Sequence, residues 1–284
     1  MGLMVTPLNM ALVDESVARA LAEDVGTGDI TTLLTVPAGV EAFGEFIAMQ
    51  AGVLAGMPVV ERVFHQVEPC IGVTPLVGEG QRFEAGAVLA EVRGDARGIL
   101  NAERVVLNFL QRLSGIATLT AQFVEEVRDL PVRICDTRKT TPGLRYLERY
   151  AVRMGGGYNH RFGLYDAVLI KDNHIAVCGG ITQAVQRARQ VLPHTMKVEV
   201  ECTTLAQVAE ALEAGVDIIL LDNMSPEQLR EAVRLAKGRV LLEASGGVNL
   251  QTVRAIAETG VDAISVGALT HSAPAIDIKL EVHL

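Results

Sequence analysis

The sequence predicts an α/β protein built from two successive parts, on the basis of two patterns. Beyond residue 130, short β-rich runs alternate with helical patterns at the spacing of one strand, one turn, one helix and one turn. That spacing is typical of βαβ units with a parallel sheet. Before residue 94, short apolar runs are interrupted by Gly and Pro, which indicates strands and tight turns around one helix. The β-rich runs favour closure into a small α/β barrel, although an open doubly wound sheet shares the pattern.

The elements of the first part follow from the spacing of apolar residues. Apolar positions at helical spacing over residues 9–23 predict an opening helix, which the stretch EDVGTGDITT then ends. Residues 36–94 are expected to form the strands and turns. Residues 98–128 predict a long helix with a break near Ser114 and Gly115.

The second part contains six β-rich runs. They cover residues 132–135, 167–170, 197–201, 217–221, 240–244 and 263–267. In the third run, Val198 and Val200 share one face of the strand, and Glu199 and Glu201 share the other. In a barrel with helices packed outside, at least one of these acids is expected to face the interior.

A helix is predicted between the first two β-rich runs, in TPGLRYLERYAVRM. Thr141 is placed to cap it, and Pro142 suits the first helical position. The face opposite the apolar stripe carries Arg145, Glu148 and Arg149, which are most simply interpreted as solvated charges.

Composition narrows the class of protein. The chain has 284 residues, of which 49% are hydrophobic, so it can bury a full core without disulfides or metal. Its net charge of −9 argues against a broad surface for nucleic acid, which needs a field of Lys and Arg. The four cysteines are scattered without metal-ligand spacing, which fits a reducing cytoplasm, and no segment reaches the length of a membrane span.

Polar residues follow the β-rich runs, at the positions where parallel sheets and barrels bind ligands. They are Asp136, Thr137, Arg138 and Lys139 after the first run, Lys171 to His174 after the second, Glu201 and Asp222 at the third and fourth, Ser245, Gly246 and Gly247 after the fifth, and Gly267 in the sixth. The two glycines of EASGGVN let a backbone approach a ligand closely, and a helix beginning near Asn249 would direct free N–H groups at an anion.

Positive charges are concentrated near this expected sheet edge. His160, Arg161 and Lys171 lie within twelve residues of one another and join Arg138 and Lys139. Two like charges 4 Å apart repel by about 4 kcal/mol at an effective dielectric of about 20, so such a cluster needs anions. The residues therefore predict a site for a small polyanion, opposite acids that could hold Mg²⁺ or a ribose.

At these residues the sequence resembles a known family. The stretch DTRKTTPGLRYLERYAVRMGGGYNHRFGLYDAVLIKDNHI is similar to the signature region of the quinolinate phosphoribosyltransferases, and the likeness extends from EDVGTGDITT through LNAERVVLNFLQRLSGIAT to LLDNMSPEQL, LEASGGVN and DAISVGALTHS. The resemblance implies an N-terminal open α/β sandwich domain over residues 1–112. It also implies an incomplete, seven-stranded-type α/β barrel over 113–284, whose C-terminal end returns to the first domain.

The resemblance implies a reaction as well. Members of the family take quinolinate and phosphoribosyl pyrophosphate to nicotinate mononucleotide, pyrophosphate and CO₂, with Mg²⁺, in NAD biosynthesis. The residues at matching positions that would bind quinolinate are Arg104, Thr137, Arg138, His160, Arg161 and Lys171. Those that would bind phosphoribosyl pyrophosphate are Lys139, Lys171, Glu201, Asp222, Ser245, Gly246, Gly247, Val266, Gly267 and Ala268. Catalytic roles fall to Lys171, Glu201, Asp222 and His160, and the metal to Glu201 and Asp222, directly or through water.

The resemblance further implies a homodimer, or a hexamer made of three dimers, with Arg104 contributed across the subunit interface. Several other functions fit part of the pattern. A paralogue associated with molybdenum transport shares the fold, and a nicotinate-using transferase would neutralise one carboxylate fewer. Lys171 at a strand end would also suit a Schiff-base lyase, and a non-catalytic anion-binding barrel would need the cations alone.

Overall fold

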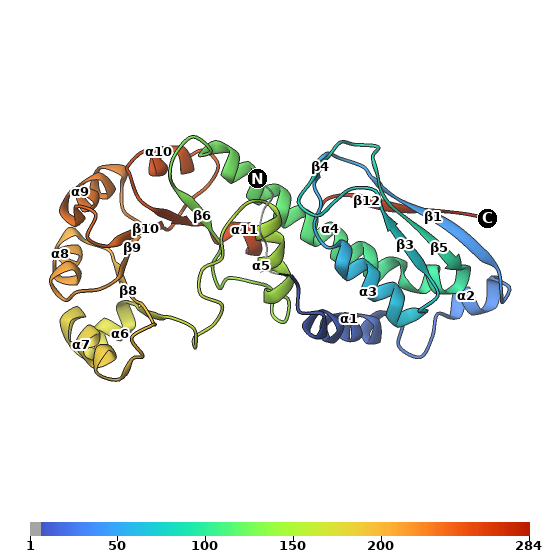
Figure 1. Cartoon of the computed structure of the whole chain (residues 1–284), viewed down its shortest axis with the longest axis horizontal. Helices are drawn as coiled ribbons and strands as arrows, with labels where there is room; N and C mark the ends of the chain where they lie inside the picture. Colours follow the sequence, from blue (N-terminus) through green and yellow to red (C-terminus); the bar gives the residue numbers. More distant parts are fainter. Residues whose placement is uncertain (1–6) are drawn as a thin grey trace. The chain divides into compact units, whose positions relative to one another are not determined.

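The computed structural model describes residues 7–284, which form two compact units (Figure 1). The first unit contains the residues up to Ala121 together with Thr140–Gly156 and Leu269–Leu284, and the second contains Gln122–Lys139 and Gly157–Ala268. The family resemblance implies one boundary at residue 112. The contacts divide the chain nine residues later, after Ala121, and assign two later segments to the first unit. Within the described residues, no helix combines the length and the apolar character needed to cross a membrane.

The first unit is built on an antiparallel sheet of four strands. Its elements are α1 (Met10–Asp24), α2 (Ile30–Thr35), β1 (Glu41–Ala48), β2 (Gly52–Val53), α3 (Met57–Val67), β3 (Gly72–Pro75), β4 (Arg82–Phe83), β5 (Val88–Asp95), most of α4 (Ala96–Glu126), α5 (Arg145–Met154), α11 (Ala268–His271) and β12 (Ile278–His283). The strand order is β12-β1-β5-β3, so a strand from the end of the chain pairs with the first strand. Alternate residues of β1 are buried, which gives the sheet one core face.

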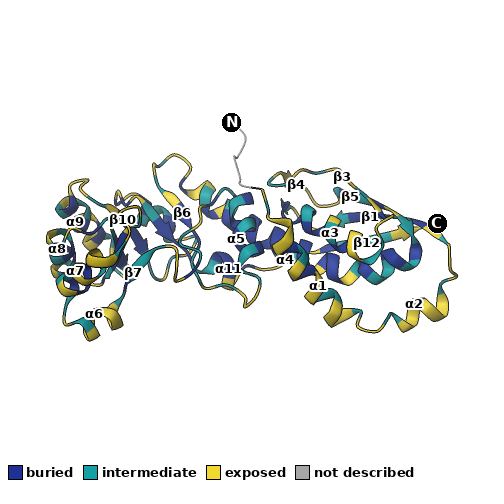
Figure 2. Cartoon of the chain, turned by 60° about the horizontal axis from the view of Figure 1, so that its bottom comes forward, coloured by how far each residue is buried: buried dark blue, intermediate teal, exposed yellow. Residues whose placement is uncertain are grey.

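The second unit is built on a parallel sheet of six strands. Its elements are β6 (Arg133–Cys135), β7 (Val168–Ile170), α6 (Asp172–Cys178), α7 (Ile181–Val191), β8 (Val198–Cys202), α8 (Leu205–Glu213), β9 (Ile218–Asp222), α9 (Pro226–Ala236), β10 (Leu241–Ser245), α10 (Val253–Ala257) and β11 (Ala263–Ser265). The order is β6-β11-β10-β9-β8-β7, and Tyr158 adds a parallel bridge to Cys135 on β6. Helices α6 to α10 lie outside the curved sheet, with exposed faces outward (Figures 1 and 2).

These observations confirm the predicted fold class, an α/β chain with an N-terminal sheet domain and a partial α/β barrel. Each of the six predicted β-rich runs contains a strand with at least one buried apolar residue. The opening helix is also confirmed; it begins after Asn9, whose side chain accepts the Ala11 N–H.

The predicted break in the long helix is wrong. Helix α4 continues without interruption through Ser114 and Gly115. A Cβ atom on Gly115 would lie 2.0 Å from the carbonyl oxygen of Pro274. The glycine is therefore needed for close packing against a distant segment, and it costs the helix only about 1 kcal/mol relative to alanine.

The predicted start of the next helix is also wrong, and so is the expected exposure of its charges. Helix α5 begins at Arg145, and Thr141 instead donates its backbone N–H and its hydroxyl to the Glu148 carboxylate. Glu148 is fully buried and accepts two further hydrogen bonds from the Arg112 guanidinium, at 3.1 and 2.8 Å. Arg149 is also buried. These side chains anchor the segment that follows Lys139.

Candidate active site

The carboxyl ends of the parallel strands surround a pocket of about 590 Å³. Eleven of the residues singled out in the sequence line it: Thr137, Arg138, Lys139, His160, Arg161, Lys171, Glu201, Asp222, Ser245, Gly246 and Gly247. The strand register explains the grouping, because Glu201 pairs with Leu220 and Asp222 pairs with Ser245 on neighbouring strands. Segments far apart in the sequence therefore present their polar ends at one edge.

Four predicted residues are not among those that line the pocket. Val266 is buried directly after β11, where its N–H donates to the Cys135 carbonyl, and Gly267 and Ala268 follow it. Arg104 lies on α4 within the first unit.

Lys171 and the two predicted metal-binding acids lie on neighbouring strand ends. The Lys171 ammonium forms an ion pair with the Glu201 carboxylate, and both side chains line the pocket. On the next strand, Asp222 Oδ2 accepts a 2.7 Å hydrogen bond from the Asn223 side-chain amide. The sequence predicted acids opposite the cations, whereas Glu201 is paired directly with one of those cations, Lys171.

The glycine-rich turn after β10 is shaped by positive φ angles. Gly246 has φ +94° and Gly247 has φ +62°, in the left-handed region that favours glycine. A Cβ atom on Gly246 would lie 2.3 Å from Asn223 Oδ1. The expected helix at Asn249 is wrong, because α10 begins only at Val253 and is five residues long. The turn itself, rather than a helix terminus, borders the pocket.

The charge of Arg138 acts on Arg161 in the same pocket. The pKa of Arg161 is lowered, first by burial and then by the positive charge of Arg138. The Arg161 guanidinium also donates a 2.9 Å hydrogen bond to the Ala167 carbonyl, which limits where it can point. Two neighbouring guanidinium groups form a site that a carboxylate or phosphate would stabilise.

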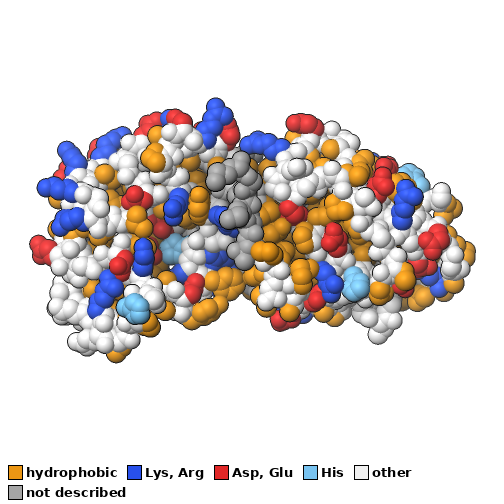
Figure 3. All heavy atoms as spheres, in the orientation of Figure 1, with side chains coloured by type: hydrophobic (Ala, Val, Ile, Leu, Met, Phe, Trp, Pro, Cys, Tyr) orange, Lys and Arg blue, Asp and Glu red, His pale blue; other side chains and the backbone are white. Residues whose placement is uncertain are grey.

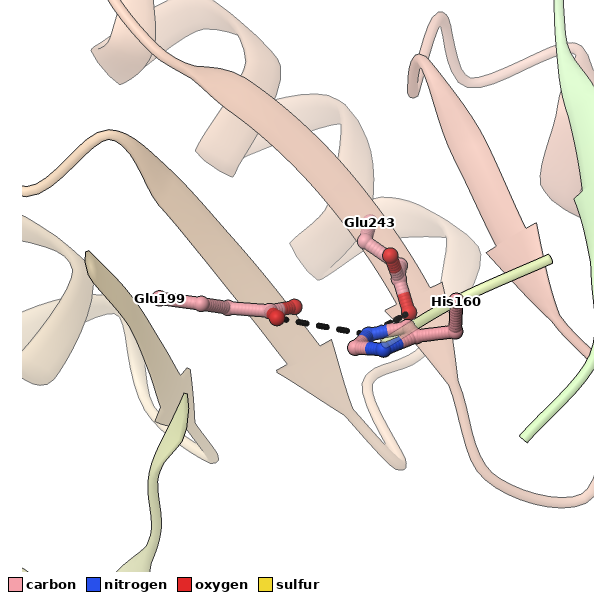
Figure 4. Close-up of side chains that lie close together, drawn as sticks. All are labelled: His160, Glu199 and Glu243. Atoms are coloured by element: carbon pink, nitrogen blue, oxygen red, sulfur yellow. Dashed lines mark ion pairs between the residues drawn. The ribbon is translucent and has the colours of Figure 1, made fainter. Parts of the chain in front are cut away.

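His160 stands against two buried acids that are not among the site residues predicted from the sequence. Its Nε2 atom is 3.3 Å from Glu199 Oε2 on β8 and 3.3 Å from Glu243 Oε1 on β10 (Figure 4). Burial lowers the pKa of His160, but hydrogen bonds to these acids outweigh it and raise that pKa to about 10. Its Nδ1 atom lies 2.7 Å from the Arg161 backbone nitrogen and accepts that N–H when the ring carries a single proton, which then lies on Nε2 between the two carboxylates.

Period-two alternation could have identified both acids. Glu199 shares a strand face with Glu201, and Glu243 stands between the buried residues Leu242 and Ala244. Burial raises the pKa of Glu199 above its usual value. Within residues 7–284, the three side chains whose potential metal-ligand atoms lie close together are His160, Glu199 and Glu243.

The described part of the face in Figure 3 carries mixed charges rather than the field of Lys and Arg that a nucleic-acid interface needs. On the described part of the face in Figure 3, Lys and Arg side chains are interspersed with Asp and Glu side chains. The cations that converge do so inside the pocket, which has room for a small molecule. The arrangement can neutralise several negative charges on one ligand and still offers two carboxylates for a metal ion.

Comparisons with known proteins identify the family of the chain. Residues 29–114 match the N-terminal domain of quinolinate phosphoribosyl transferase, and residues 116–281 match its C-terminal domain. The probable carboxylating nicotinate-nucleotide pyrophosphorylase of Bacillus subtilis (strain 168) is 46% identical over 262 residues, which are 92% of this chain and 90% of the relative. The mitochondrial decarboxylating quinolinate phosphoribosyltransferase 2a of Nicotiana tabacum is 44% identical over 93% of this chain and 80% of its own length.

A solved structure shares the whole fold. The nicotinate-nucleotide pyrophosphorylase from Francisella tularensis has a TM-score of 0.94 at 43% identity and covers 98% of both chains. Both family domains, the curated relatives and this structure agree over nearly the full length. The chain belongs to the quinolinate phosphoribosyl transferase family.

Proposed function

We propose that this chain transfers the phosphoribosyl group of phosphoribosyl pyrophosphate to quinolinate with decarboxylation, giving nicotinate mononucleotide, pyrophosphate and CO₂ in NAD biosynthesis. The observation that carries this proposal is the convergence of Arg138, Lys139, Arg161 and Lys171 in one pocket of a chain with a net charge of −9. A pyridine with two neighbouring carboxylates and a sugar bearing a phosphate and a pyrophosphate supply the negative charges that this cluster requires.

The arginine side of the pocket is our candidate for quinolinate. Arg138 and Arg161 are close enough for the charge of one to lower the pKa of the other, and a dicarboxylate between them would relieve that repulsion. Thr137, His160 and Lys171 line the same pocket and complete the proposed set. An Arg161→Ala variant that bound and converted quinolinate normally would exclude this assignment.

The glycine-rich side is our candidate for phosphoribosyl pyrophosphate. Lys139 would face the pyrophosphate, and the turn of Ser245, Gly246 and Gly247 would lie against the 5′-phosphate. We propose that Val266, Gly267 and Ala268, which directly follow β11, also contribute to the phosphate site. Glu201 and Asp222 fit Mg²⁺, because two carboxylates with substrate phosphates and water are a common environment for this ion. When bound, Mg²⁺ would neutralise charge on the leaving pyrophosphate.

The proposed chemistry needs binding and charge stabilisation more than a nucleophilic side chain. The pyridine nitrogen forms a bond to C1′ while the bond from C1′ to the pyrophosphate oxygen breaks, and Glu201 or Asp222 stabilises the positive charge that develops on the sugar. The N-alkylated ring then loses its 2-carboxylate as CO₂, because the ring cation accepts the electron pair. A proton next adds to that carbon, and Lys171 is our candidate donor.

A Schiff-base lyase using Lys171 is less well supported. The Lys171 nitrogen forms an ion pair with Glu201, and an ammonium has no lone pair with which to attack a carbonyl. Borohydride trapping distinguishes the two functions. We expect no covalent adduct on Lys171.

We also propose that the working enzyme contains at least two copies of the chain in the cytoplasm. Arg104 is not among the residues that line the pocket of the second unit, and we propose that a second copy supplies it. Whether three such dimers form a hexamer is answered by the mass of the particle in solution. Mixing an Arg104→Ala variant with an Arg161→Ala variant tests the shared site, since hybrid dimers would regain one intact site.

One assay tests the main proposal. Purified protein is incubated with quinolinate, phosphoribosyl pyrophosphate and Mg²⁺, and nicotinate mononucleotide and CO₂ are measured. Nicotinate in place of quinolinate is the control substrate, and a chelator tests the metal requirement. We expect the protein to turn over quinolinate but not nicotinate, and we expect the chelator to abolish this activity. Folded protein that binds phosphoribosyl pyrophosphate but leaves quinolinate unchanged would favour the paralogue associated with molybdenum transport.

A further inference from the structure

Three buried acids converge on His160. Asp136, Glu199 and Glu243 are 0%, 4% and 7% exposed, respectively. Asp136 Oδ1 accepts the His160 backbone N–H at 2.8 Å, while the other two acids face the ring at Nε2 from separate strands (Figure 4). The backbone of His160 is therefore held by Asp136, and its ring is held by Glu199 and Glu243.

The second ring nitrogen extends this chain of contacts to Arg161. His160 Nδ1 accepts the Arg161 N–H at 2.7 Å, so the ring fixes the backbone of the next residue. Both ring nitrogens then have partners within the protein, and the ring proton points toward the acids. His160 is accordingly placed to orient Arg161 and the pocket wall rather than to deliver a proton to the substrate.

Burying these acids lowers the stability of the folded state, so stability alone does not explain their position. Burying a carboxylate costs several kcal/mol unless its hydrogen bonds are complete. Glu199 Oε1 is buried without a hydrogen-bond partner in the described structure, so its desolvation is only partly compensated. Glu243 is better supported, because the Ser265 hydroxyl donates to it. The arrangement resembles the supporting shell around a functional side chain, in which outer partners fix orientation and tautomer.

We propose that Glu199 and Glu243 are positioning residues of the quinolinate site, which hold the His160 ring so that Arg161 is fixed at the dicarboxylate. This inference rests on the proposed function. Both acids lie on barrel strands, and Glu243, His160 and Arg161 all line the substrate pocket. His160, Glu199 and Glu243 also line a second pocket of about 860 Å³ at the amino ends of the strands. These three side chains therefore lie between the substrate pocket and the second pocket.

The test compares the two substrates. Wild-type turnover of quinolinate is measured first, and its absence would refute the proposed function rather than this inference. In Glu243→Gln and Glu199→Gln, we expect the KM for quinolinate to rise about tenfold, since small misplacements of a binding group have effects of this size. The KM for phosphoribosyl pyrophosphate should stay within about twofold.

A double-mutant cycle separates positioning from general damage. If the acids act through the ring, Glu243→Gln should change the quinolinate KM by less than about twofold when His160 is already alanine. The matched control is Glu210→Gln, because Glu210 is an acid of the same unit that caps α7 by accepting the Thr182 N–H at 3.0 Å. Both KM values should be unchanged in that variant.

Several outcomes would overturn the inference. They are an unchanged quinolinate KM in both glutamine variants, an equal rise in both KM values, or an undiminished effect in the His160→Ala background. A divalent metal ion that copurifies in one-to-one ratio and is lost in Glu243→Gln would also overturn it, because the cluster would then be a metal site. If Glu243→Gln does not fold, the Ser265→Ala variant tests the proposal instead, because the Ser265 hydroxyl donates to Glu243. Removing the hydroxyl should raise the quinolinate KM about two- to threefold, and no change would refute the proposal.

Discussion

Replacing Gly246 with alanine should weaken phosphoribosyl pyrophosphate binding through its neighbour. The new Cβ would lie 2.3 Å from Asn223 Oδ1 and 2.9 Å from Asn223 N, whereas such contacts are essentially never shorter than 3.0 Å. The amide of Asn223 must therefore move by at least about 0.7 Å. Its Nδ2 atom donates to Asp222 Oδ2, so the carboxylate proposed for Mg²⁺ loses its support.

A displacement of about 1 Å at a reacting group can cost about a hundredfold, so we expect the KM for phosphoribosyl pyrophosphate to rise about 10- to 100-fold, equivalent to about 1.4–2.8 kcal/mol. Gly238→Ala is the matched control, because Gly238 has φ +72° and a Cβ added there would meet no atom within 4 Å. It should lower the free energy of unfolding by about 1–2 kcal/mol and leave both KM values unchanged. Steady-state kinetics and thermal unfolding measure the two effects. Equal kinetics in both variants would refute the steric argument.

Four other substitutions test separate parts of the structure. Arg138→Ala should raise mainly the KM for quinolinate and Lys139→Ala mainly that for phosphoribosyl pyrophosphate, each by about tenfold or more, and a reversed pattern would exclude the assignment. Glu148→Ala should lower the free energy of unfolding by about 3–5 kcal/mol, because it leaves Arg112 without its buried partner; a urea titration that shows less than about 1 kcal/mol would contradict this. Burial raises the pKa of Glu79, so the folded state holds the proton more tightly than the unfolded chain and stability falls as pH rises above the unfolded value near 4.5. Wild-type Tm should accordingly decline relative to Glu79→Gln between pH 4 and 7, and parallel Tm curves would count against it.

Features that depend on residues close together in the sequence could be predicted from it. Strands and polar strand ends could be predicted because a parallel strand is a short apolar run, and because ligands meet such sheets at the carboxyl ends. The pocket therefore contains Arg138, Lys171 and Glu201 as expected. The acids Glu199 and Glu243 belong to the same class of inward residue, but alternation alone does not say which inward acid contacts a histidine.

Two of the errors share one physical cause, which is dependence on partners distant in the sequence. Gly115 suggests a helix break until Pro274 is seen against it. Glu148 suggests a solvated charge until Arg112 is found to donate to it. Propensity and periodicity describe a segment by itself, whereas packing and buried ion pairs depend on what the completed fold brings beside it.

The pairing of β12 with β1 has a consequence for the order in which the protein can be made. Residues 41–48 leave the ribosome well before residues 278–283, the strand that covers one of their edges. Until then, β1 offers unpaired N–H and C=O groups to other chains. The intervening barrel strands must meanwhile be synthesised, and the first unit completes its sheet only afterwards. A nascent chain stalled before residue 278 would thus carry an open β-edge, which is a natural target for chaperones and for aggregation.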